Sequence, residues 1–195
     1  MNSRALALTA TSIATLIYGA TFTVAKEVMP LYIMPYGFIL LRVGGATAIF
    51  WFLGAFLKVG AIQKADYKRI FFASFFGIAL NMLTFFKGLS YTTPISASVM
   101  MVTTPILVLI FSSILLKERL FLKKILGVIV GLIGAVVLIA YGNATGQDAE
   151  NRMLGNFLVF VNAASYGLYL VIVRDIIQKY NPILFVKWLY LFGFI

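Results

Sequence analysis

The stretch LALTATSIATLIYGATFTVA at residues 6–25 decides the fold, because a second stretch repeats its central pattern. In the first stretch Tyr18-Gly19 precedes Lys26, and in residues 154–173, LGNFLVFVNAASYGLYLVIV, the pair Tyr166-Gly167 precedes Arg174 at the same spacing. Each stretch is about 20 residues long, the length of a helix that crosses a bilayer. If five helices separate the two starts, the second copy enters the membrane from the opposite side, as in inverted-repeat transporters.

The composition fits a membrane protein. Hydrophobic residues make up 62% of the 195-residue chain and charged residues only 11%, too little polar surface to cover a water-soluble domain. The apolar runs are about 20 residues long, whereas strands of a membrane barrel have about ten alternating residues. We therefore predict an all-α, polytopic transmembrane helical bundle.

Seven apolar runs are separated by short polar segments. The last run is too short to cross a bilayer alone, so we expect it to be cut off or continued elsewhere. The longest polar stretch, residues 142–153, predicts a first repeat over 1–142, a linker over 143–153 and an incomplete second repeat over 154–195. The runs cover residues 6–25, 35–57, 70–89, 95–116, 123–141, 154–173 and 182–195.

Two local signals shape the fourth run. Thr93-Pro94 combines a helix cap with a proline at the first helical position, so it predicts the start of that helix. Pro105 removes a backbone hydrogen bond and predicts a kink near the middle of the membrane. Such a kink serves as a hinge or only adjusts packing, and the sequence leaves both readings open.

The basic residues that flank the runs are strongly biased to one side. Eleven lie on the N-terminal side and three on the other, which predicts a cytoplasmic N-terminus and a multi-pass protein of a bacterial-type inner membrane. The eleven are Arg4, Lys58, Lys64, Lys68, Arg69, Lys117, Arg119, Lys123, Lys124, Arg174 and Lys179, and the three are Lys26, Lys87 and Arg152.

Several kinds of chemistry are disfavoured. The chain has no histidine and no cysteine, so the commonest general base and thiolate metal sites are absent. We expect no metal, no cofactor and no catalytic residue. Basic residues lie between the apolar runs rather than on one face with interleaved aromatics, so the net charge of +10 does not indicate nucleic-acid binding. The expected partners are the lipid bilayer and a small-molecule solute, and the oligomeric state stays open.

Polar side chains within the apolar runs are the candidates for solute binding, because a charged group at the bilayer centre costs about 2.5–3.5 kcal/mol on insertion scales. Arg42 lies within the second run and could contact an anion in a cavity or extend toward the outer surface. Asn81 and, more weakly, Asn162 lie near the middle of their runs, where an amide contacts a substrate or joins two helices. Lys87 lies near the end of its helix, where anchoring at the surface competes with a binding role.

Tyr18 and Tyr166 form a further candidate pair. Each lies at a similar depth in its run, and the two runs are expected to point in opposite directions. A phenol at that depth needs a hydrogen-bond partner, and the adjacent Gly19 or Gly167 allows a helix or ligand to approach closely. Packing alone explains one such tyrosine, whereas the pair predicts residues on either side of a central binding site.

The acidic residues all fall in loops or at helix ends. Without a carboxylate at mid-membrane depth, the chain lacks a group for binding a cation or relaying protons there. This distribution disfavours proton-driven export of lipophilic cations and mildly favours neutral, zwitterionic or anionic solutes that contact Arg42. The six are Glu27, Asp66, Glu118, Asp148, Glu150 and Asp175.

Several motifs in order resemble those of the EamA family of the drug/metabolite transporter superfamily. The segment from Tyr18 to Phe22 with Lys26 resembles the opening motif, although tyrosine replaces the usual tryptophan. Further matches are Leu40-Leu41-Arg42 in the second run, Phe86 to Thr92 with Ser96-Ala97-Ser98 at the junction of the third and fourth, and Pro105 with Lys117-Glu118-Arg119-Leu120 in and after the fourth.

The resemblance implies ten helices in two inverted five-helix repeats, with a cavity between the repeats and alternating access for small metabolites or amino acids. It covers the first repeat and two helices of the second. The main hypothesis is an integral membrane permease for a small metabolite or amino-acid-like solute, and the alternative is a non-transporting assembly subunit or a non-functional fragment. A membrane-embedded lipid-modifying enzyme is disfavoured, because such enzymes need clustered acids or histidines.

Overall fold

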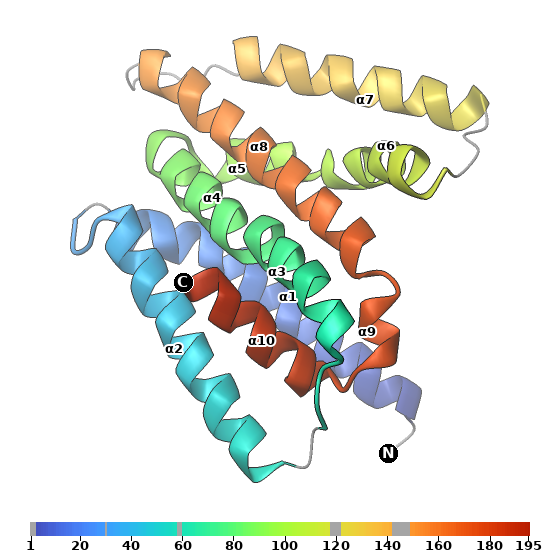
Figure 1. The fold of residues 1–195 in the computed structure, drawn as a ribbon. Coiled ribbons are helices and arrows are strands. Elements are labelled where there is room, and N and C mark those ends of the chain that lie inside the picture. Colours follow the sequence, from blue (N-terminus) through green and yellow to red (C-terminus); the bar gives the residue numbers. More distant parts are fainter. Residues whose placement is uncertain (1–2, 30, 58–59, 118–121, 142–148) are drawn as a thin grey trace.

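The computed structural model describes residues 3–29, 31–57, 60–117, 122–141 and 149–195, and all regular secondary structure within these ranges is helical (Figure 1). This confirms the predicted all-α bundle. The helices, in chain order, are α1 (Ser3–Val28), α2 (Pro35–Phe56), the 3-10 turn η1 (Lys64–Asp66), α3 (Tyr67–Ser74), the π-helical turn η2 (Phe75–Ala79), α4 (Leu80–Tyr91), α5 (Pro94–Met101), α6 (Thr104–Leu116), α7 (Leu122–Tyr141), α8 (Ala149–Val173), α9 (Ile176–Lys179) and α10 (Pro182–Phe194).

Five segments in the described part of the chain are long and apolar enough to cross a membrane. The third combines η1, α3, η2 and α4, and the fourth combines α5 and α6. Helix α10 is shorter, with 13 residues, as expected for the last apolar run. The five segments are Ala5–Val28, Pro35–Phe56, Lys64–Tyr91, Pro94–Leu116 and Asn151–Val173.

Prolines define the starts of several helices. Pro35, Pro94 and Pro182 occupy the first turns of α2, α5 and α10, where the missing N–H costs nothing. The predicted cap before α5 is present, because the Thr93 hydroxyl accepts a hydrogen bond of 3.2 Å from the Ser96 backbone N–H. An equivalent cap begins α10, where the Asn181 side chain accepts from the Ile183 N–H at 2.9 Å.

The expected interruption of the fourth span lies between α5 and α6. The Val102 N–H donates to the Val99 carbonyl and the Thr103 N–H to the Met100 carbonyl, both in the tighter 3-10 pattern. Pro105 follows directly in the first turn of α6. The ring removes one helical donor and crowds the preceding turn, so the helix restarts there instead of continuing.

Helix α8 is the centre of the packing. It lies against α4 along much of its length and also contacts α6, while α10 packs between α2 and the α3–η2 segment (Figure 1). Helix α7 contacts α5, α6 and α8 at the outside of the bundle. The two later helices, α8 and α10, therefore pack mainly on helices of the first predicted repeat.

Contacts at the ends of the third span show that α1 and α8 run in opposite directions. Lys26, near the end of α1, donates to the carbonyls of Leu89 and Ser90 at the end of α4. Gly155, near the start of α8, approaches Gly88 at this same end of the span, whereas Ile172, near the end of α8, meets Arg69 at the beginning of α3. The antiparallel course is the one expected for the two matching stretches.

One boundary differs from the prediction. Helix α8 begins at Ala149, so residues 149–153, assigned to the linker, are helical. The rest of the predicted linker, up to residue 148, lies outside the described residues.

Candidate functional site

A cavity of about 1130 Å³ lies among α1, α2, η2, α4, α6, α8 and α10. Its wall is formed by residues of both matching stretches, with Tyr18 and Tyr166 among them. Most of the lining is apolar and aromatic, and the polar members other than the tyrosines are Thr21, Arg42, Asn81, Thr104 and Asn162. The cavity thus contains five of the six residues that the sequence analysis selected.

Tyr18 and Tyr166 each contact one aromatic ring, with different ring geometries. Tyr166 stacks on Tyr169 one turn further along α8, with ring centroids 5.7 Å apart and an angle of 26° between the rings. Tyr18 makes an edge-on contact with Phe22, at 5.4 Å and 84°. Both phenols therefore line the cavity next to a second aromatic ring that comes from the same helix.

Arg42 supplies the positive charge of the cavity wall. Its guanidinium carbon Cζ lies 5.6 Å from the ring centroid of Phe86, a distance suited to a cation–π contact. Phe86 itself is buried on α4. The N–H donors of the guanidinium can serve an anion in the cavity.

Asn81 and Asn162 form a reciprocal brace between α4 and α8. The Asn162 amide donates to the Asn81 carbonyl at 2.8 Å, and the Asn81 amide donates to the Asn162 carbonyl at 3.4 Å. The helix-joining alternative considered for Asn81 is thus present. Both residues also line the cavity, so joining the helices and facing a solute are compatible.

Hydrogen bonds at and beside the π-helical turn η2 join the third span to α8 and α10. A π-turn displaces backbone carbonyls from the regular ladder, and such turns recur at functional sites. The Ser165 hydroxyl of α8 donates to the Phe76 carbonyl of this turn at 2.6 Å, and the Ser74 hydroxyl donates to the Leu189 carbonyl of α10. Gly77 of the same turn lines the cavity.

Lys87 does not line the cavity. Its ammonium lies 4.7 Å from the ring centroid of Tyr91 and 5.6 Å from that of Tyr36, near the end of α4. Lys87 lies six positions after Asn81, which turns it about 120° around the helix from Asn81 on the cavity face. The structure therefore places Lys87 at the surface-anchoring position, away from the other five candidates.

Some polar residues of this region were not selected from the sequence. Thr104, Ser165 and Asn156 are buried, and Thr92 donates to the Asn156 side-chain oxygen at 2.5 Å across the α4–α8 contact. A helical projection of residues 149–173 would have found Ser165, because it lies about 60° from Asn162 on the same face of α8, whereas Asn156 lies on the opposite side from Ser165. Nothing in the sequence indicated that Thr104 would face the cavity.

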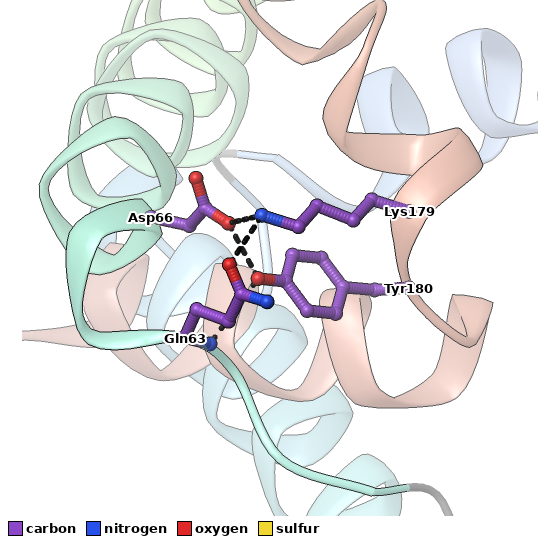
Figure 2. A network of polar contacts seen from close by, with 4 residues as sticks. All are labelled: Gln63, Asp66, Lys179 and Tyr180. Carbon is purple, nitrogen blue, oxygen red and sulfur yellow. Dashed lines mark hydrogen bonds and ion pairs between the residues drawn. The ribbon is translucent and has the colours of Figure 1, made fainter.

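A polar network joins the two matching halves at one end of the bundle. Lys179 Nζ lies 2.6 Å from Gln63 Oε1 and 2.6 Å from Asp66 Oδ2, while the Tyr180 hydroxyl donates to Asp66 and accepts from the Gln63 N–H (Figure 2). The hydrogen bond with Asp66 raises the pKa of Lys179 above its ordinary value. We call these four residues, Gln63, Asp66, Lys179 and Tyr180, the polar latch.

Arg69 adds a second link at the same end. Its Nε donates to the Ile172 carbonyl at 3.0 Å, and its guanidinium pairs with Asp175 at 3.2 Å. Arg69 and Lys179, both assigned to the N-terminal side of the membrane, thus lie at the same end of the bundle. No group of three or more acidic, histidine or cysteine side chains that could hold a metal occurs in the described ranges.

Comparison with known proteins identifies the family. The family model described as "EamA-like transporter family" matches residues 5–140. The chain belongs to the EamA-like transporter family. No solved structure matches the chain significantly.

Several relatives of this EamA-like chain are named as transporters. An "Uncharacterized transporter" of Archaeoglobus fulgidus is 28% identical over 179 residues, 91% of this chain and 59% of that protein. The "Uncharacterized transporter YyaM" of Bacillus subtilis is 27% identical over 168 residues, 85% of this chain and 54% of the relative. A "WAT1-related protein" of Arabidopsis thaliana is 24% identical over 135 residues, 57% of this chain and 37% of the relative. The chain spans about half the length of the curated relatives it matches.

Proposed function

We propose that this EamA-like chain acts as an integral membrane permease that moves a small metabolite or amino-acid-like solute by alternating access. The cavity carries the proposal, because residues from both matching, oppositely directed helices line one space at mid-span depth. Its volume of about 1130 Å³ is ample for a small organic solute. The bias of basic residues supports an inner-membrane protein with a cytoplasmic N-terminus and two inverted repeats.

The polar latch suggests how access would alternate. It joins η1 and the residue before it, at the start of the third span, to α9 and the residue that follows it, so it links the two matching halves at this end of the bundle. Surface ion pairs contribute little stability each and can separate and re-form during transport. The interruption between α5 and α6 beside the cavity supplies a hinge for the same motion.

Single-cysteine labelling tests the proposal directly, because the chain has no cysteine of its own. Val108→Cys places a thiol in the cavity wall. We expect a charged, membrane-impermeant maleimide to label this thiol both in right-side-out vesicles and in inside-out vesicles, that is, from either face of the membrane. Ile129→Cys on the outer face of α7 is the control, since a lipid-facing thiol reacts slowly from both sides.

Labelling of Val108→Cys from one side under every condition would refute alternating access. The non-transporting subunit would then be the better description. Labelling from neither side, with Ile129→Cys equally unreactive, would show that the cavity is closed to water and would also contradict the permease.

A further inference from the structure

The charge of the cavity wall is the first observation on the solute's chemistry. Among the lining residues that the structure describes, Arg42 is the only ionised side chain, and no aspartate, glutamate or lysine accompanies it. No hydrogen bond or ion pair joins Arg42 to another described residue, so its donors are available. A cationic solute would meet a like charge, whereas an anion would find a bidentate donor.

An unpartnered acceptor in the cavity wall is the second observation. Asn162 is only 2% exposed, yet its side-chain oxygen Oδ1 has no hydrogen-bond partner among the described residues. The amide cannot simply turn over, because its nitrogen is held at 2.8 Å from the Asn81 carbonyl and an oxygen there would meet another acceptor. Oδ1 is therefore a buried acceptor that the described residues leave unpaired, in a side chain that lines the cavity.

Thr104 strengthens this second observation. Its hydroxyl oxygen is also buried in the cavity wall without a partner in the described part of the chain. Buried polar atoms are nearly always paired in native proteins, so two unpaired ones in one cavity point to a missing partner. Water or a solute with an N–H or O–H group meets that requirement.

The aromatic wall is the third observation. Phe22, Phe86, Tyr166 and Tyr169 contribute rings to the lining, and the stacked pair of tyrosines presents extended π faces. Flat rings pack against such walls in offset or edge-on arrangements with centroids about 4.5–7 Å apart. A solute body that is itself a ring would gain more contact there than a flexible polar chain.

We infer that the cavity binds an organic monoanion with a flat, ring-containing body and an N–H or O–H donor remote from its charge. Arg42 receives the anionic group, the unpaired oxygens of Asn162 and Thr104 in the same cavity wall accept from the donor, and the aromatic wall contacts the ring. This inference rests on the proposed permease, since it names the solute class of the same cavity.

Three related probes test the inference on the purified 195-residue chain. 4-Hydroxybenzoate offers the anion, ring and donor, 4-methoxybenzoate lacks the donor, and 4-hydroxybenzylamine replaces the anion by a cation. Isothermal titration should show 4-hydroxybenzoate binding about tenfold more tightly than 4-methoxybenzoate, and the amine not binding measurably. Equal affinity for all three, or preference for the amine, would overturn the inference.

Variants assign the two ends of the solute. Arg42→Gln should weaken both benzoates about tenfold or more, whereas Lys87→Gln, which removes a cation outside the cavity, should leave both affinities unchanged. Asn162→Leu should abolish the difference between the two benzoates while keeping the affinity for 4-methoxybenzoate. If Asn162→Leu fails to fold, Thr104→Val is the substitute, because it removes one unpaired hydroxyl at nearly constant shape.

The result is separable from that of cysteine labelling. If the three probes bind in the expected order but Val108→Cys is labelled from one side only, the permease proposal is refuted and the solute class is supported. If labelling occurs from both sides but the probes bind without preference, the solute class is refuted and the permease proposal is supported. An unchanged affinity in Arg42→Gln would overturn the role assigned to that residue.

Discussion

Helices α1 and α8 carry the same Tyr-Gly pair, but their surroundings differ greatly. Of the most apolar stretch of each span, 6% of the residues are buried in α1 and 44% in α8. A Cβ atom at Gly19 would have no neighbour within 4 Å, whereas one at Gly167 would lie 3.4 Å from the Leu107 side chain. The shared motif thus sets depth and direction, while burial depends on the partners that each helix meets.

The partners of α8 are backbone as well as side chains. Gly155 and Gly88 let α8 and α4 cross so closely that a Cβ at Gly155 would lie 2.9 Å from the Gly88 carbonyl oxygen. Small residues permit this kind of crossing in membranes, where close packing replaces the hydrophobic drive. Helix α1 makes no comparable crossing in the described structure and is fixed at its end by Lys26.

The largest expected difference between the two helices follows from these glycines. Gly155→Ala should destabilise the chain by about 1–3 kcal/mol, because the new methyl group meets backbone atoms that cannot move away. Gly19→Ala should cost nothing and gain up to about 1 kcal/mol of helix propensity. Unfolding by increasing SDS in mixed micelles, followed by helical circular dichroism, measures both. Equal midpoints for the two variants would show that the α4–α8 crossing is not tightly packed.

Much of this contrast could not be read from the sequence. The apolar runs, the Thr93-Pro94 cap, the break before Pro105 and the opposite directions of α1 and α8 follow from local signals, and the structure contains all of them. The π-helical turn does not follow from local signals, because the carbonyl of Phe76 in this turn accepts a hydrogen bond from Ser165, on a helix far away in the chain. Propensity arguments treat each helix alone and cannot foresee such a partner.

The site was predictable to a similar extent. Mid-span depth found Tyr18, Tyr166, Arg42, Asn81 and Asn162, because a polar group at that depth needs protein or solute around it. Lys87 lies near the end of its helix, where surface anchoring competed with a binding role, and its helical phase turns it away from the cavity. The unpaired oxygens of Thr104 and Asn162 depend on side-chain geometry and are visible only in the structure.

A smaller difference between α8 and α1 is expected from their hydroxyl groups. Ser165→Ala removes the 2.6 Å hydrogen bond to the Phe76 carbonyl and should cost about 0.6–1 kcal/mol, a typical value for an interhelical bond in a membrane. Thr15→Ala is the matched change in α1, where the hydroxyl bonds only to the Thr11 carbonyl of its own exposed helix turn. We expect Thr15→Ala to have no measurable effect in the same SDS titration. A loss for Thr15→Ala as large as that for Ser165→Ala would mean that α1 is packed as α8 is.

The smallest effect on stability, and the most informative for motion, concerns the charged ends of the two helices. Asp66→Asn weakens the polar latch beyond α8, because Asp66 accepts from both Lys179 and Tyr180. We expect faster maleimide labelling of Val108→Cys from the latch end of the bundle and unchanged stability. About 1 M salt should give the same increase in labelling rate when the four latch residues are left unchanged. Glu27→Gln removes an exposed carboxylate near the end of α1 and is the matched control.

The pKa of Lys179 is raised above its ordinary value, so the contribution of its ion pair to the polar latch is complete below about pH 10 and is lost only above that pH. The rate of labelling should therefore not change between about pH 6 and 9 through this group. Equal acceleration by Glu27→Gln would indicate a general charge effect and would remove the latch from the mechanism.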